Sequence, residues 1–249
     1  MSEEIGRLDR GDGQRLAWRR VAGRGPTVVW LGGFMSDMTG TKAQALADWA
    51  MAEGRAFLRF DYLGHGQSSG AFRDGAITRW RADALAAITA LTDGPLVLVG
   101  SSMGGWISCL VAAEIPERLR AMVLIAPAAD FTEALMKPGL PPEALAAIER
   151  DGEWIRPSAY EPTGYPITRH LLEDGARWTI LGGPVPVDVP VRILQGREDP
   201  DVPWTHALEL AGAIRSEDVV FTLIKDGDHR LSRPQDVARL VAAVAEVAR

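Results

Sequence analysis

The first candidate for chemistry is a serine in the pentapeptide Gly-Ser-Ser-Met-Gly, residues 100–104. The apolar run 96–100 leads into it, and a stretch with helical periodicity, residues 104–115, follows. A G-x-S-x-G match between a strand and a helix is typical of a nucleophile elbow, a tight turn that lifts a serine hydroxyl above the end of a sheet. We expect Ser102, rather than Ser101, to be the nucleophile, because only Ser102 has glycines two residues away on both sides. The alternative is a glycine-serine turn with no chemical role.

A serine hydroxyl is a weak nucleophile and needs a general base, for which histidine is the usual choice. The sequence contains four histidines: His65, His170, His206 and His229. Only His229 follows the last predicted strand, residues 218–224, which is where this order of elements places the base. We therefore expect His229 to be the base. The alternative is a solvated loop histidine.

The base in turn needs a carboxylate that orients its ring and stabilises the imidazolium. Glu198, Asp199 and Asp201 follow the predicted strand 191–195, whose carboxyl end should lie beside the histidine loop. We expect Asp199 to be this acid, with Asp201 as the second choice and Glu198 pointing into solvent. Two acids close to His229 in sequence are interpreted as solvated turn residues: Asp226 and Asp228.

Attack on a carbonyl also requires hydrogen-bond donors for the oxyanion. One is expected from the backbone N–H of Met103, directly after the candidate nucleophile. The other is expected from the backbone N–H of Phe34, because Gly32 and Gly33 allow the main chain to approach the site closely. The alternative for this segment is an ordinary glycine turn.

A further glycine-rich loop, residues 61–70, follows the predicted strand 55–60 and contains Asp61 and His65. Aspartate and glycine in this pattern favour a tight turn. We therefore expect a structural role for both residues, near the catalytic end of the sheet.

Short apolar runs alternate with helical periodicity along most of the chain. Strands are predicted over 27–31, 55–60, 96–100, 120–126, 191–195 and 218–224. Helices are predicted over 42–54, 79–94, 104–115 and 234–248. Alternating strands and helices indicate an α/β fold, with a mostly parallel central sheet and helices on both faces.

This alternation stops in a proline-rich segment, which divides the predicted organisation. Residues 1–128 and 188–249 should form the core, and residues 129–187 should form a small lid insertion of a few short helices over one end of the sheet. The alternative is an irregular crossover with no functional role. Apolar residues that could line an acyl pocket are present, but none is assigned to substrate: Met136, Leu140, Trp154, Ile155 and Trp178.

Charge and cysteine content exclude several classes of protein. The 249 residues carry a formal net charge of −6 without a block of Lys and Arg, which argues against binding to nucleic acid or anionic membranes. No window approaches the roughly 20 apolar residues of a membrane span. A single cysteine, Cys109, cannot form an internal disulfide, and the acidic first ten residues do not resemble a secretory or transit signal. We therefore expect a cytoplasmic protein.

Five stretches, taken in order, resemble the α/β-hydrolase family: "LGGF", "FDYLGHGQSS", "GSSMGG", "GREDPDVP" and "DGDHR". The resemblance covers nearly the whole chain from about residue 27. It implies the α/β-hydrolase fold, and it carries the family's nucleophile, acid and base onto Ser102, Asp199 and His229. Further stretches, among them "SDMTGTKAQAL" and "GEWIRPSAY", resemble a family member that acts as an acyl-protein thioesterase and esterase. We expect this chain to depart from that member at its N-terminus, where no organelle-targeting segment is predicted, so it resembles a bacterial-type relative.

We therefore expect a serine hydrolase that cleaves carboxylic esters or acyl-thioesters through an acyl-enzyme intermediate. Its partner would be a small-molecule acyl ester or thioester. No cofactor or metal is expected, because the histidine spacings do not resemble a ligand set. The oligomeric state stays open. The alternatives are a lactonase, a C–C hydrolase or a cofactor-free peroxidase of the same fold, or a non-catalytic binding module.

Overall fold

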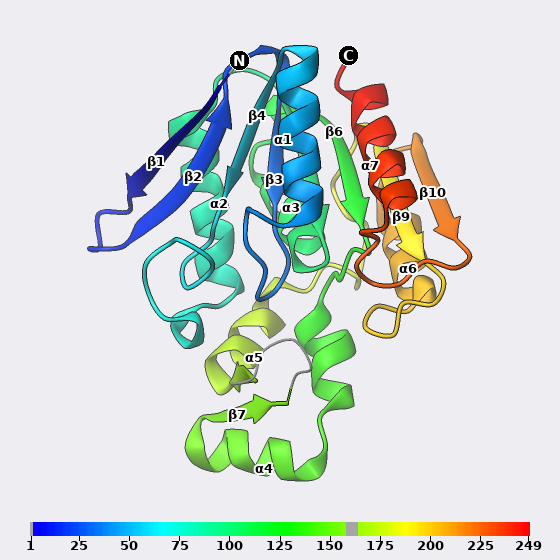
Figure 1. The fold of residues 1–249 in the computed structure, drawn as a ribbon. Coiled ribbons are helices and arrows are strands. Elements are labelled where there is room, and N and C mark those ends of the chain that lie inside the picture. Colours follow the sequence, from blue (N-terminus) through cyan, green and yellow to red (C-terminus); the bar gives the residue numbers. More distant parts are fainter. Residues whose placement is uncertain (1, 158–163) are drawn as a thin grey trace.

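A mixed sheet forms the centre of the computed structural model, which describes residues 2–157 and 164–249 (Figure 1). Within these residues, eight strands form one sheet in the order β1-β2-β4-β3-β5-β6-β9-β10. Their bounds are β1 Glu3–Asp9, β2 Arg15–Val21, β3 Arg24–Leu31, β4 Arg55–Phe60, β5 Leu96–Ser101, β6 Leu119–Ile125, β9 Val191–Gly196 and β10 Val219–Ile224. From β4 to β10 all neighbours are parallel, which confirms the predicted mostly parallel sheet.

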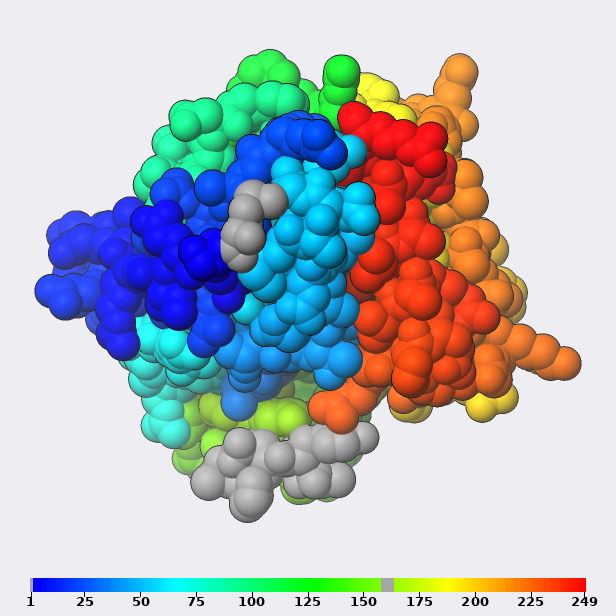
Figure 2. Space-filling view, turned by 45° about the horizontal axis from the view of Figure 1, so that its top comes forward, coloured from blue at the N-terminus to red at the C-terminus, as the bar shows by residue number. Residues whose placement is uncertain are grey.

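Helices cover both faces of the sheet, as predicted. Helices α1 (Thr41–Glu53) and α7 (Pro234–Val247) lie side by side on one face, where Figure 2 shows them in pale blue and red. Helices α2 (Ile77–Leu91), α3 (Met103–Glu114) and α6 (Trp204–Ala213) pack on the other face. Each face has its own apolar cluster, so the central strands are buried on both sides.

The first two strands were not predicted. Strand β1 pairs antiparallel with β2, and β2 pairs antiparallel with β4, so this hairpin extends the sheet at its edge. Because β1 is an edge strand, much of its surface faces solvent and carries charged side chains such as Glu4 and Arg7. The hydrophobic pattern of β1 is therefore weak. Strand β2 is more buried, and its Leu16 and Trp18 belong to the core.

The insertion runs between β6 and β9, which are neighbours in the sheet. Its described elements are η3 Thr132–Met136, η4 Lys137–Gly139, α4 Pro142–Asp151, β7 Glu153–Arg156, β8 Tyr165–Thr168, α5 Arg169–Gly175 and η5 Ala176–Trp178. Short helices were expected; the antiparallel pair β7–β8 was not. Figure 1 shows the insertion beyond the carboxyl ends of the parallel strands. Residues 158–163 lie outside the described residues.

The insertion has a small apolar core of its own, centred on α4, β8 and α5. Its members are Leu140, Ala144, Ile148, Ile167 and Leu172, with Phe34, Met136 and Trp154 packed against them. Phe34 also packs against the main core, so it joins the two clusters. One buried carboxylate ties the insertion to α2: Asp174 accepts from the N–H and hydroxyl of Thr78. A second, Asp130, joins the two ends of the insertion, because it accepts from the backbone N–H groups of Ile180 and Leu181.

Candidate active site

Ser102 lies in the sharp turn between β5 and α3. Its backbone has φ 54° and ψ −120°, a conformation that is strained for a residue with a side chain. Glycines make the turn possible, because a Cβ on Gly104 would lie 2.0 Å from the carbonyl oxygen of Leu31, and one on Gly100 would lie 2.3 Å from that of Gly104. The turn therefore has the geometry that the G-x-S-x-G pattern predicted.

The three predicted side chains of the triad meet at the carboxyl ends of β5, β9 and β10. Oγ of Ser102 lies 3.1 Å from Nε2 of His229, and Nδ1 of His229 lies 2.8 Å from Oδ2 of Asp199. Because an ionised carboxylate only accepts, Nδ1 donates to Asp199, which leaves Nε2 of a neutral ring to accept from the serine hydroxyl. The Asp199 side chain is fully buried, whereas 22% of the His229 side chain is exposed. This arrangement can move a proton from the serine to the imidazole.

Asp199 is fixed by hydrogen bonds to both carboxylate oxygens. Oδ1 accepts from the backbone N–H groups of Asp201 and Val202, at 2.9 and 2.8 Å. Oδ2 accepts from Nε2 of the buried Gln195 at 3.1 Å, in addition to His229. Sequence reasoning missed Gln195, although a polar residue directly after the apolar pair Ile193 and Leu194 was a usable signal. The other acids of this stretch, Glu198 and Asp201, are exposed.

The predicted oxyanion donors lie beside the elbow. Gly33 approaches it closely, since a Cβ there would lie 3.2 Å from both Cβ of Ser102 and the carbonyl oxygen of Ser101. Phe34 follows directly, and Met103 is the first residue of α3, where backbone N–H groups lack helical partners. Among the described residues, neither the Phe34 nor the Met103 N–H has an assigned protein acceptor. Both donors are therefore available to a ligand.

The remaining histidines do not contact Ser102. His206 is buried on α6, and its Nε2 lies 2.7 Å from the carbonyl oxygen of Ala129. His170 is exposed at the start of α5. His65 is buried, and burial lowers its pKa to about 4 although its Nδ1 contacts the Leu63 carbonyl.

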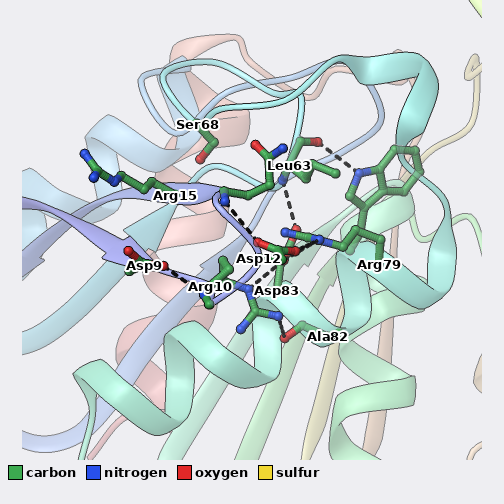
Figure 3. Close-up of polar contacts among 12 residues, drawn as sticks. Asp9, Arg10, Asp12, Arg15, Leu63, Ser68, Arg79, Ala82 and Asp83 are labelled. Carbon is green, nitrogen blue, oxygen red and sulfur yellow. Dashed lines mark hydrogen bonds and ion pairs between the residues drawn. The ribbon is translucent and has the colours of Figure 1, made fainter.

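The loop that contains His65 is held by two side chains of α2. Figure 3 shows Arg10 and Arg79 converging on Asp83 of α2, whose Oδ2 accepts from the backbone N–H of Leu63 at 2.9 Å. The indole N–H of Trp80 donates to the carbonyl of the same leucine at 3.1 Å. These contacts agree with the structural role expected for this loop.

Asp61 connects this loop to the segment that contains Phe34. Its carboxylate accepts from the backbone N–H groups of Met38 and Gln67, at 2.7 and 2.8 Å. Burial raises the pKa of Asp61 to about 6, against the lowering effect of these two bonds. The buried Asp61 therefore acts here as a bridge between two turns, and it has no contact with Ser102 among the described hydrogen bonds.

A lysine that sequence reasoning missed lies behind the histidine loop. The ammonium of Lys42, near the start of α1, donates to the carbonyl of Arg230, next to His229. Burial lowers the pKa of Lys42 to about 8. The only signal in the sequence was its position at a helix start, which does not indicate such a contact.

One set of described residues could offer atoms to a metal ion: Asp199, Asp201 and His229, whose ligand atoms lie within 4.8 Å of one another. The Asp199 oxygens already accept the four hydrogen bonds described above. An ion would have to replace some of them, so the donor set suits a hydrogen-bonded triad better than a metal site.

One surface hollow of the described residues lies away from the candidate site. A hollow of about 350 Å³ lies where β9 and β10 begin, at the opposite end of the strands from Ser102, and is lined by Arg120, Arg192, Asp218 and Glu246 among others. Its arginine at position 192 is already paired with both of these acids. In the described part of the chain, the helices are too short or too polar to cross a bilayer.

Known proteins resemble this chain over most of its length. Residues 26–169 match the family model described as serine aminopeptidase, S33. A mouse protein, described as palmitoyl-protein thioesterase ABHD10, mitochondrial, is 37% identical over 96% of this chain and 81% of its own length. The human protein of that description is 36% identical over 96% of this chain and 78% of its own length.

Two relatives of solved structure have the same fold over almost their full length. A protein from Agrobacterium vitis S4 has a TM-score of 0.94 and 43% identity, covering 100% of this chain and 99% of its own. Mouse alpha/beta hydrolase domain-containing protein 10 has a TM-score of 0.89 and 36% identity, covering 98% of this chain and 97% of its own. The predicted fold and the predicted resemblance are thereby confirmed.

Proposed function

The chain belongs to the serine aminopeptidase S33 family of α/β-hydrolases, and from that premise we propose that it hydrolyses carboxylic esters and acyl-thioesters with Ser102 as nucleophile. In this proposal His229 is the general base and Asp199 orients it. The backbone N–H groups of Phe34 and Met103 form the oxyanion hole.

One observation carries the proposal: the continuous chain of contacts from the Ser102 hydroxyl through His229 to Asp199, at 3.1 and 2.8 Å. Both distances lie within the range that proton transfer requires. A binding module would have no use for a strained serine aligned with a base and a buried acid, so this contact favours an enzyme.

Acylation begins when Oγ of Ser102 attacks the substrate carbonyl carbon and its proton passes to Nε2 of His229. The carbonyl oxygen becomes an oxyanion, which accepts hydrogen bonds from the N–H groups of Phe34 and Met103. Asp199 stabilises the imidazolium. The tetrahedral intermediate collapses, the bond to the leaving oxygen or sulfur breaks, and His229 gives its proton to the departing alcohol or thiol.

Deacylation repeats these steps with water. His229 takes a proton from a water molecule while the oxygen of that water attacks the carbonyl carbon of the acyl-enzyme. The N–H groups of Phe34 and Met103 bind the new oxyanion. Collapse releases the carboxylic acid, and the proton returns from His229 to Oγ of Ser102. The cycle uses residues of the chain and water alone.

The acyl-thioester part of the proposal is supported by the mouse and human relatives, which are named as palmitoyl-protein thioesterases. The insertion packs its own apolar cluster against Phe34, directly after the Gly33 that borders the elbow, so we propose that residues 129–187 act as a lid. Those relatives are described as mitochondrial, so the comparisons do not support the cytoplasmic location, which stays a prediction.

The test compares the wild type, Ser102→Ala and the matched control Ser101→Ala. Each is assayed against a p-nitrophenyl ester and an acyl-thioester with thiol detection, and each is treated with a fluorophosphonate probe. We expect Ser102→Ala to lose turnover and covalent labelling, and Ser101→Ala to retain both. Labelling and near-normal turnover of Ser102→Ala would show that the proposal is wrong.

A further inference from the structure

The segment between β3 and α1 contains the peptide bond that joins Gly33 to Phe34. Gly33 is buried against the elbow. A Cβ added to it would lie 3.2 Å from both Cβ of Ser102 and the carbonyl oxygen of Ser101. This peptide therefore borders the position where the serine hydroxyl reacts. Whether its N–H or its C=O faces that position decides whether it can stabilise an oxyanion.

The carbonyl of this peptide has two donors, and both come from Ser36. The Ser36 hydroxyl donates to the Gly33 oxygen at 3.0 Å, and the Ser36 backbone N–H donates to the same oxygen at 3.2 Å. The described residues contain no cis peptide, so C=O and N–H of this unit point in opposite directions. With the carbonyl directed at Ser36, the Phe34 N–H is directed away from Ser36.

The orientation of the Gly33–Phe34 peptide needs hydrogen bonds to fix it, because glycine restricts the backbone less than other residues do. A residue without a side chain lets the adjoining peptide rotate at low cost, and a flipped peptide would present an oxygen to the developing negative charge. The return of the chain to Ser36 is itself strained, since Met35 has φ 56°. The Ser36 hydroxyl supplies the shorter of the two bonds that oppose the flip.

We propose that Ser36 is a positioning residue for the oxyanion hole, whose hydroxyl keeps the Phe34 N–H facing the reacting carbonyl oxygen. The inference rests on the proposed function, in which that N–H is a donor. Ser36 itself lies at the surface, so its replacement is compatible with the fold.

The test compares the wild type with Ser36→Ala, Ser36→Thr and the matched control Ser216→Ala. Ser216 also has a local hydroxyl–backbone contact, but just before β10, at the far end of the strands. The readouts are kcat and KM, the pH profile, the melting temperature, and inhibition by an alkyl boronic acid. This inhibitor forms a tetrahedral adduct with a reactive serine and places an oxygen in the oxyanion hole.

We expect Ser36→Ala to lower kcat about tenfold, the effect of one lost hydrogen bond, with KM within about twofold of the wild type. Boronic acid affinity should fall by the same factor, and the acid limb of the pH profile should not move, since the triad is intact. Ser36→Thr keeps the hydroxyl and should restore kcat to within about threefold. Ser216→Ala should match the wild type throughout.

Two results would overturn the inference and leave the proposed function standing, provided that Ser102→Ala is inactive. One is unchanged kcat and boronic acid affinity in Ser36→Ala. The other is an equal loss in Ser36→Ala and Ser36→Thr together with a lower melting temperature, because the hydroxyl would then be irrelevant. An active Ser102→Ala would instead refute the proposed function, and the inference with it.

Discussion

The side-chain amide of Gln195 lies 3.1 Å from Oδ2 of Asp199, the same carboxylate oxygen that contacts His229. Gln195 is fully buried, and its Nε2 also contacts the carbonyl oxygens of Gly196 and Val202 at 3.0 Å each. The Gln195 amide therefore holds the Asp199 carboxylate in place through the oxygen that also contacts His229. Such supporting contacts decide how well a catalytic group keeps its orientation.

The first prediction concerns this contact. Gln195→Glu keeps the side-chain length but places an acceptor against Asp199, and the added negative charge favours the protonated imidazolium. We expect kcat to fall about tenfold or more and the acid limb of kcat/KM to shift to higher pH. Gln195→Met removes the donor without adding charge, so it should lower kcat with a smaller shift. An unmoved pH profile in Gln195→Glu would contradict the positioning role.

The second prediction separates the two aspartates of the acid stretch. Asp199→Asn should lower kcat by about 10³–10⁴-fold, because an amide can no longer hold the imidazole in the required tautomer. Asp201→Asn is the control, since its side chain is exposed and only its backbone N–H contacts Asp199. Steady-state rates on the p-nitrophenyl ester measure both. Equal losses in the two variants would argue against Asp199 as the orienting acid.

The third prediction compares a glycine that has no space for a side chain, Gly104, with one that has open space, Gly212. Ala at position 104 would bring its Cβ to 2.0 Å from the Leu31 carbonyl oxygen, so Gly104→Ala should cost about 3 kcal/mol or more in the free energy of unfolding. Gly212 lies inside α6 with open space around it, so Gly212→Ala should add roughly 0.5–1 kcal/mol. Urea denaturation measures both. A tolerated Gly104→Ala would mean that the elbow packs less tightly than described.

The fourth prediction concerns pH and stability. The pKa of His65 falls from 6.5 to about 4 on folding, so the unfolded chain binds this proton first as the pH drops. The contribution of His65 to stability is present above pH 6.5 and is lost as the pH falls towards 4. The loss amounts to about 3 kcal/mol at most.

Replacing His65 should therefore flatten the acid side of the stability curve. In His65→Phe, the unfolding free energy should decline less between pH 7 and 4 than in the wild type, whatever its absolute value. The pKa of Asp61 rises to about 6 on folding, so Asp61 stabilises the folded protein more as the pH falls. This contribution is the same in the wild type and in His65→Phe, so it does not affect the comparison. Parallel curves for the two proteins would show that His65 is not buried in its neutral form.

Patterns within single segments predicted the core of the fold. The strand 55–60 coincides with β4, and the predicted helices end within a few residues of α1, α2, α3 and α7. These segments have strong periodicity because both faces of the sheet are covered. The hairpin β1–β2 lacks this signal, since an edge strand with charged side chains reads like a loop. The pair β7–β8 is too short to show alternation.

The candidate site divides in the same way. Ser102, His229 and Asp199 follow from motif and order, because each lies at the carboxyl end of a strand. Gln195, Ser36 and Lys42 depend on contacts between segments, or on which way one peptide faces, and neither is encoded in local spacing.

Strands β6 and β9 hydrogen-bond to each other although the whole insertion separates them in the chain. The pairing of these two strands therefore does not depend on the insertion. The insertion leaves the sheet after β6 and returns to it at the neighbouring strand, β9. Changes in the length or sequence of the insertion are therefore compatible with unchanged positions of Ser102, Asp199 and His229 at the strand ends. Chimeras that transplant residues 129–187 between relatives would test whether the insertion decides which acyl groups are accepted.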